Sequence, residues 1–168
     1  IGSVFRHDTY FLYAEADGLI QGVLPLAHVN SMLFGNALVG LPFAVYGGVA
    51  ALNEQAALAL EAEAQSIARR LKVAHLELRN IDQRHGDWPT QDLYVTFRKE
   101  ILPQEDANML AIPRKQRAMV RKGIKNGLTS SIDSDVDAFF ALYADNVHRH
   151  GTPAMPKAYF KALPIARS

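Results

Sequence analysis

The chain has 168 residues, of which 49% are hydrophobic and 21% are charged. A chain of this length and composition can bury a core, so we expect one compact domain. Its formal net charge of +1 gives no overall attraction to nucleic acid or to an anionic membrane, so an electrostatic function needs a local cluster of charge. The sequence contains no cysteine, which excludes disulfides, thiolate zinc sites and a cysteine nucleophile.

No stretch approaches the roughly 20 consecutive apolar residues of a membrane-spanning helix, because Gly, Pro, Asn and His interrupt each apolar run. We therefore expect a soluble, cytoplasmic protein, and the absence of cysteine fits a reducing compartment. The sequence opens at Ile1 and lacks the basic, apolar and small-residue order of a signal peptide. We expect that the chain is truncated at both ends.

The first part of the chain carries three β-favouring apolar runs. Residues 9–16 and 19–29 flank Asp17-Gly18, a dipeptide that tolerates positive φ at both central positions of a turn, and they predict a β-hairpin. Residues 37–46 form the third run and predict a buried strand. This run ends at Gly47-Gly48, which indicates a conformationally permissive loop.

Residues 53–72 change to a helical period, with Leu60, Ala64 and Ile67 on an apolar stripe and Glu61 among the polar residues. This pattern predicts an amphipathic helix that packs on a sheet.

The rest of the chain alternates between strand and helix signals. This order predicts an α/β fold with a mixed β-sheet flanked by helices. The expected elements are strands at 73–79 and 92–98, a helix at 113–126 with Pro113 as its first residue, a helix capped by Asp133 or Ser134 and ended by Gly151 and Pro153, and a short helical piece that starts at Pro156 and is interrupted by Pro164.

The predicted helix 113–126 carries six bases and no acid, in a chain whose overall charge is nearly balanced. At about 100° per residue the bases fall on one broad side of the helix. We expect the helix to pack through its opposite stripe, which contains Met119, Val120, Gly123 and Ile124. The bases are Arg114, Lys115, Arg117, Arg121, Lys122 and Lys125.

Arg114 and Lys115 lie in the first turn of this helix, where the helix dipole disfavours each cation by roughly 0.3–1 kcal/mol. A phosphate at this end would relieve that cost and would bind free backbone N–H and guanidinium groups together. An anionic ligand such as a diphosphate, a CoA or a tRNA backbone is one interpretation. The other is a solvated cationic face that only aids solubility.

The predicted strand 73–79 places His75, Glu77 and Arg79 on one face. Glu77 on a central strand would suit a general base for an amine nucleophile. The alternative is structural, because buried charged groups generally need partners and these side chains can pair with one another.

The loop after the third run offers a second candidate. A ligand could approach the backbone at Gly47-Gly48 closely, with Tyr46 as a hydrogen-bonding or stacking wall. A plain turn would explain the same glycines without a ligand.

We expect no metal site. His148 and His150 lie at the predicted end of a helix, where cations interact favourably with the dipole, and this explains both. The HExxH, EF-hand, GxSxG and Walker A patterns are all absent.

Short motifs follow one another along nearly the whole chain. They are GVLPLAHV at 22–29, LFG at 33–35, LPF at 41–43, YGG at 46–48, LELRN at 76–80, VTFRK at 95–99 and IPRKQRAMVRKG at 112–123, followed by Tyr143, GTP at 151–153 and YF at 159–160. In this order they resemble FemAB-like proteins of the GNAT acyltransferase superfamily, and most strongly the FemAB-related branch associated with bacterial PEP-CTERM and exosortase systems.

This resemblance implies a GNAT-like fold and acyl or aminoacyl transfer to an amine. It implies a pair of GNAT-like domains, so residues 1–168 would be one domain, the N-terminal half of a longer protein whose second domain is missing. Better-known Fem proteins attach amino acids from aminoacyl-tRNA to peptidoglycan precursors. The branch with the strongest likeness is tied to exopolysaccharide and protein-sorting gene clusters.

Two features depart from the family pattern. The [Q/R]xxGx[G/A] pyrophosphate loop of acetyl-CoA enzymes is absent, since Gln83-Arg84-His85-Gly86 reaches Trp88 where Gly or Ala belongs. This argues against CoA binding by this part of the protein. The closing residues 163–168 also differ from the family helix.

The sequence leaves two functions open. The first is a transferase in which an amine attacks an activated acyl carbonyl, with acyl-CoA or aminoacyl-tRNA as the donor. The second is a noncatalytic module that binds RNA or another acidic partner through helix 113–126, although no aromatic residues interleave the bases. In the first, Glu77 or Tyr46 would handle the proton, and Arg114, Lys115, Arg117, Arg121 and Lys122, with Gly47, Gly48 and Arg79, would bind the anionic substrate.

Overall fold

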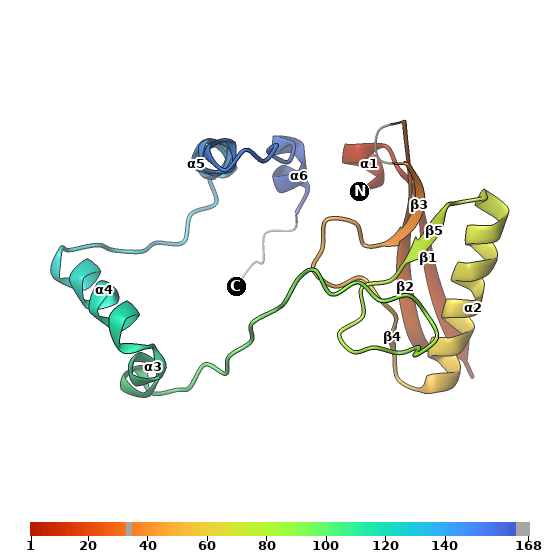
Figure 1. The fold of residues 1–168 in the computed structure, drawn as a ribbon, viewed down its shortest axis with the longest axis horizontal. Helices are drawn as coiled ribbons and strands as arrows, with labels where there is room; N and C mark the ends of the chain where they lie inside the picture. The colour runs from red at the N-terminus through yellow and green to blue at the C-terminus, as the bar shows by residue number, and fades with distance from the viewer. Residues whose placement is uncertain (33–34, 164–168) are drawn as a thin grey trace. The chain divides into compact units, whose positions relative to one another are not determined.

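The structure is a computed structural model that describes residues 1–32 and 35–163 (Figure 1). The chain divides into two compact units, one made of Ile1–Trp88 and Val136–Ser168 and the other of Pro89–Asp135. The first unit contains a mixed five-stranded sheet flanked by helices. The predicted α/β class with a mixed sheet is therefore confirmed.

The sheet is built on a long hairpin of β1 (Asp8–Ala16) and β2 (Leu19–Ser31), which are antiparallel. The turn between them is Asp17-Gly18, with φ values of 53° and 75°, so the predicted hairpin is confirmed. The strand order is β1-β2-β3-β5, and β4 pairs with β2. The remaining strands are β3 (Gly35–Gly40), antiparallel to β2, β4 (Ala50–Ala51), and β5 (His75–Glu77), parallel to β3.

The helix α2 (Glu54–Leu71) covers one face of this sheet (Figure 1). Its N-terminus is capped by Asn53, whose Oδ1 accepts a hydrogen bond from the backbone N–H of Ala56 at 2.8 Å. Lys72 ends the helix in the left-handed conformation. The predicted helix 53–72 is confirmed. The core between α2 and the sheet consists of Leu24, Leu26, Leu38, Leu60, Ala64 and Ile67.

Three further helices belong to the first unit: α1 (Gly2–Phe5), α5 (Val136–Arg149) and α6 (Lys157–Ala162). Aromatic rings connect α1 to the loop after β3 and to α6, because Phe5 stacks on Phe43 at 4.3 Å and lies 5.7 Å from Tyr159. The sequence patterns predicted α5 and α6 but not α1. Pro164, which was expected to interrupt the last helix, lies outside the described residues, as do Leu33 and Phe34 of the LFG motif.

The second unit contains two helices, α3 (Glu105–Ala111) and α4 (Arg114–Lys125). α4 corresponds to the predicted basic helix, and Gly127 follows its end with a φ of 71°. Pro113 is the N-cap of α4 instead of its first helical residue, which corrects the prediction by one position. α3 was not predicted.

Two strand predictions are corrected by the structure. Residues 92–98 form no strand, and all seven are exposed. Alternation of apolar residues makes a strand only where a neighbour supplies a ladder. The third run ends at Gly40 because Leu41 and Phe43 have φ values of 42° and 74°, which turn the chain out of the sheet. Within the described ranges, no helix is long and apolar enough to cross a membrane.

Candidate functional site

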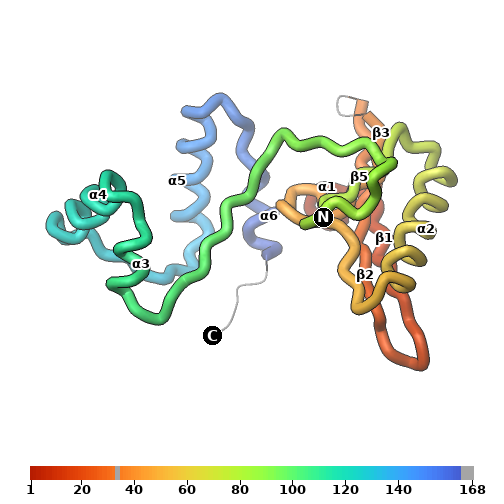
Figure 2. Tube along the Cα trace, turned by 60° about the horizontal axis from the view of Figure 1, so that its bottom comes forward, coloured from red at the N-terminus to blue at the C-terminus, as the bar shows by residue number. Residues whose placement is uncertain are grey.

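Two segments that are distant in the sequence meet beyond the ends of β3 and β5 (Figure 2). The backbone N–H groups of Gly47 and Gly48 both donate to the carbonyl of Arg79, at 3.0 and 3.1 Å. Because β3 and β5 are parallel, their carboxyl ends lie at the same edge of the sheet. In open α/β sheets this edge is a common place for ligands. We call the loop 41–48 together with residues 77–80 the β3/β5 corner.

The corner holds an ion pair between Glu77 and Arg79. Arg79 Nε donates to Glu77 Oε1 at 2.7 Å, and Arg79 Nη1 donates to the carbonyl of Ala44 at 2.8 Å. Both charged side chains are partly exposed. This pairing agrees with the structural interpretation of the strand, and the role of Glu77 as a general base stays a prediction.

The two glycines of the loop allow very close approaches within the protein. A Cβ atom on Gly47 would lie 2.0 Å from the carbonyl oxygen of Gly40, and one on Gly48 would lie 1.8 Å from Asn80 Oδ1. Neither distance is possible for real atoms, so residues with side chains would force the corner apart. Protein contacts therefore account for both glycines.

Asn80 contributes a feature that the sequence patterns did not reveal. Within the described residues, its Oδ1 atom is buried and has no hydrogen-bond partner. An unsatisfied buried acceptor costs roughly 1–3 kcal/mol, so Asn80 Oδ1 lowers the stability of the folded protein.

The predicted residues of this region converge. Tyr46 is half-buried and directly precedes Gly47 in the loop that is bonded to Arg79. The corner thus collects Tyr46, Gly47, Gly48, Glu77 and Arg79.

The bases of α4 form a separate set in the second unit. Arg114, Lys115, Arg121, Lys122 and Lys125 are exposed, and among the residues that the structure describes none of the five forms an ion pair. They are therefore accessible to an anion.

Arg117 differs from the other bases of α4. Its Nη2 donates to the carbonyls of Leu110 and Ile112 at 2.8 and 3.0 Å, and its Nε donates to Ile112 at 3.3 Å. These carbonyls lie at the end of α3, where backbone acceptors lack helical partners. Arg117 thus links α4 to the end of α3 through hydrogen bonds, which is a different role from the predicted anion binding.

The apolar stripe of α4 also differs from its prediction. Met119 is 64% exposed and Ile124 is 65% exposed, although we expected this stripe to be buried by packing. α4 contains no buried residue. Within the second unit, neither face of the helix is buried.

Sequence reasoning missed Glu61, the one buried charged side chain among the described residues. Glu61 is only 2% exposed, although the helical pattern placed it on the polar side of α2. Its Oε1 accepts from Arg84 Nε at 2.6 Å, and its Oε2 lies 2.9 Å from His85 Nε2. The spacing of Glu61 from Ala57 and Ala64 puts it on the buried stripe, and this signal could have found it.

These contacts set the charge of the cluster. Burial alone would raise the pKa of Glu61, but hydrogen bonds from Arg84 and His85 outweigh it, so the pKa lies below the ordinary value. The hydrogen bond to Glu61 raises the pKa of Arg84. The cluster is an ion pair that ties residues 84–85 to α2, and His85 also stacks on Trp88 at 4.4 Å.

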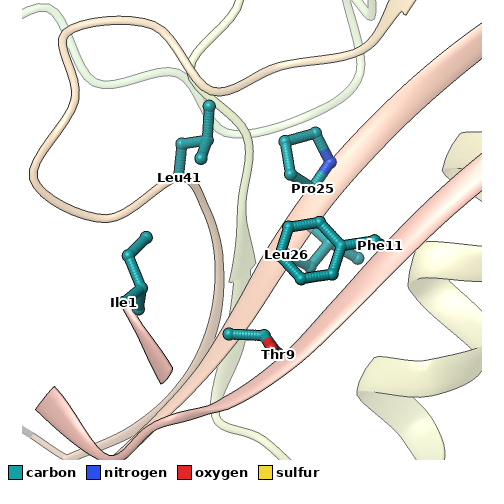
Figure 3. Close-up of a pocket in the computed structure, with 6 residues that line it drawn as sticks. All are labelled: Ile1, Thr9, Phe11, Pro25, Leu26 and Leu41. Carbon is teal, nitrogen blue, oxygen red and sulfur yellow. The ribbon is translucent and has the colours of Figure 1, made fainter. Parts of the chain in front are cut away.

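A pocket of about 200 Å³ opens beside the N-terminus (Figure 3). Thr9 supplies the one polar side chain among its six lining residues, so the pocket offers little chemistry of its own. None of the predicted site residues lines it. The lining residues are Ile1, Thr9, Phe11, Pro25, Leu26 and Leu41.

No group of three or more His, Asp and Glu side chains that could hold a metal ion occurs in residues 1–32 and 35–163. Comparisons with protein-family models, with curated proteins and with solved structures gave no match. The assignment to the FemAB-like family therefore stays a prediction that rests on the sequence motifs.

Proposed function

We propose that this chain is a GNAT-like transferase domain of the FemAB-like type, which transfers an acyl or aminoacyl group to an amine in cell-envelope or exopolysaccharide biosynthesis. The ordered motifs of the sequence and the mixed sheet of the first unit support this proposal. The observation that carries it lies at the carboxyl ends of the parallel strands β3 and β5, where Arg79 forms an ion pair with Glu77 and its carbonyl holds the loop that contains Tyr46 through Gly47 and Gly48.

The proposed reaction joins the amine nitrogen of the acceptor to the acyl carbonyl carbon of the donor. The C–N bond forms, the C–O bond of an aminoacyl ester or the C–S bond of a thioester breaks, and the amine loses one proton while the leaving group gains one. Glu77 is the candidate acceptor of the amine proton, and Tyr46 is the candidate donor to the leaving group. Arg79 holds the Glu77 carboxylate in place through the 2.7 Å contact.

The exposed bases of α4 supply the second part of the proposal. Arg114, Lys115, Arg121 and Lys122 would bind the phosphates of the donor or acceptor, because guanidinium and ammonium groups make charge-assisted hydrogen bonds with phosphate oxygens. Arg117 is left out of this set because it is bonded to the end of α3.

The binding part is tested by thermal stabilisation of the protein with CoA, acetyl-CoA, UDP-sugars and tRNA. We expect one ligand class to raise the melting temperature, and we expect Arg114→Ala and Arg121→Ala to reduce that rise. Arg69→Ala removes an exposed base from the last turn of α2 and is the matched control. A rise that survives both α4 variants would refute the assignment of these bases.

The catalytic part is tested with Glu77→Gln in a transfer assay with the stabilising donor and an amine acceptor. The amide still accepts a hydrogen bond from Arg79, so the corner stays folded while the base is lost. We expect turnover to fall by 10²–10⁴-fold, the usual contribution of a general base, with ligand stabilisation unchanged. Glu63→Gln on α2 is the control, and equal turnover in both variants would exclude Glu77 as the base.

A noncatalytic module that binds RNA is the second candidate, and the five exposed bases of α4 favour it. RNA binding would weaken steeply with salt, since each neutralised phosphate of a single strand adds about −0.7 to the slope of log K against log salt. Saturable binding of one small ligand with a shallow salt dependence would favour the transferase.

A further inference from the structure

α4 exposes an apolar stripe as well as its bases. Met119, Val120 and Ile124 are 64%, 40% and 65% exposed. Leu128, which follows the end of the helix, is 74% exposed. An exposed run of large apolar side chains on one helix is a mark of an interaction surface.

The bases and the apolar stripe occupy opposite sides of the helix. At 100° per residue the bases span an arc centred near Lys125, and Met119, Val120 and Ile124 fall in the complementary arc together with Gly123 and the uncharged Gln116. No acid interrupts either side. A helix with an apolar face and a strongly basic face, both exposed, has the composition of helices that lie in the interfacial plane of a bilayer.

The chemistry of the two faces selects among anionic partners. An RNA backbone or a small phosphate ligand would pair with the bases but would leave Met119 and Ile124 in water. An anionic bilayer offers lipid phosphates for the bases and an acyl boundary for the stripe. Lysine and arginine at the edges of the stripe have stems long enough to reach the phosphates while the apolar side chains enter the boundary.

We propose that α4 docks on the surface of an anionic phospholipid bilayer, with Met119, Val120, Ile124 and Leu128 in the boundary between headgroups and acyl chains. This mode requires no spanning helix, in agreement with the finding for the described residues. The inference goes beyond the proposed transferase function and involves no residue of the β3/β5 corner. It assigns the bases of α4, which that function assigns to donor or acceptor phosphates, to lipid phosphates as well.

The test is cosedimentation of the full chain with phosphatidylcholine vesicles, with and without phosphatidylglycerol. We expect binding only to the vesicles that contain phosphatidylglycerol. Arg121→Gln should lower the partition coefficient roughly five-fold, the usual contribution of one base near an anionic surface. Ile124→Gln should lower it by about ten-fold, as expected when a large aliphatic side chain no longer leaves water.

Two controls match these variants. Arg69→Gln and Leu58→Gln change an exposed base and an exposed apolar residue of α2, and both should bind as the parent does. Circular dichroism checks that each variant is folded. We expect all of them to fold, because the altered side chains are exposed.

Equal binding to both kinds of vesicle, or no binding to either, would overturn the proposal. Binding that is lost in Arg121→Gln but unchanged in Ile124→Gln would also overturn it, because a purely electrostatic contact points to RNA or a soluble phosphate. The vesicles contain no acyl donor and no amine acceptor, so this result is independent of ligand stabilisation and turnover.

Discussion

Arg84 lies against the buried carboxylate of Glu61, with Arg84 Nε 2.6 Å from Glu61 Oε1 and Arg84 Nη2 3.4 Å from Oε2. The same guanidinium also reaches Glu54 at 3.0 Å. These contacts fix a loop of irregular backbone to the middle and the beginning of α2. This loop follows residues 77–80 of the β3/β5 corner, so the ion pair anchors to α2 the segment that leaves the candidate site.

Replacement of Arg84 by Met should destabilise the protein strongly. Glu61 would keep its charge in a buried position with only His85 as a partner, and loss of one member of a buried ion pair typically costs about 3–5 kcal/mol. The double variant Glu61→Leu/Arg84→Met should recover most of this loss because no buried charge remains. Urea unfolding of the parent, the single variant and the double variant measures both effects. A double variant that is less stable than Arg84→Met would contradict this explanation.

The same ion pair predicts how stability depends on pH. The folded pKa of Glu61 lies below its value in the unfolded chain, so its contribution is complete above the ordinary pKa of about 4.3 and is lost as the pH falls through the folded value. Between about pH 5 and pH 3 the parent should therefore lose more stability than Glu61→Gln. Urea unfolding at several pH values gives both slopes, and parallel slopes would disprove the prediction.

The close contact between Gly40 and Gly47 predicts a second sensitive position. Gly47→Ala would bring a methyl group to 2.0 Å from the carbonyl of Gly40, so the corner must open, at a cost of roughly 2 kcal/mol or more. Gly86→Ala is the matched control, since a Cβ there meets nothing within 4 Å. Thermal unfolding of both variants should show a large loss for Gly47→Ala and a change near zero for Gly86→Ala.

Arg117 should behave unlike its neighbours on α4. Arg117→Ala removes the hydrogen bonds to the carbonyls of Leu110 and Ile112, so the amides of α3 should exchange with solvent faster. Ligand stabilisation should be retained in this variant and reduced in Arg121→Ala. Hydrogen exchange and thermal stabilisation on the same samples test this, and the reverse pattern would return Arg117 to the anion-binding set.

The elements that local chemistry determines were predicted well. Asp17-Gly18 encodes its turn because few other dipeptides tolerate positive φ twice, and α2 follows from an apolar period with Asn53 as its cap. The predictions failed where the structure depends on contacts with a distant part of the chain. The run 92–98 alternates like a strand but has no ladder neighbour in the structure, and Glu61 can keep its charge on the buried stripe of α2 because Arg84 and His85 meet it from another part of the chain.

The candidate site shows the same division. The glycine loop and the strand with Glu77 were separate suggestions in the sequence, and only the parallel pairing of β3 with β5 brings them to one edge. The unsatisfied Oδ1 of Asn80 depends on that packing and has no signature in the sequence.

The parallel pairing of β3 with β5 also orders the events of folding. The β1–β2 hairpin closes across two residues, which takes microseconds in typical hairpins. β5 can join only after the chain between Gly40 and His75 has been drawn back over the sheet, and α2 shortens that segment when it forms. We expect the amides of Gly47 and Gly48 to become protected last during folding, so the corner proposed to carry the chemistry would also be among the first parts of the sheet to open.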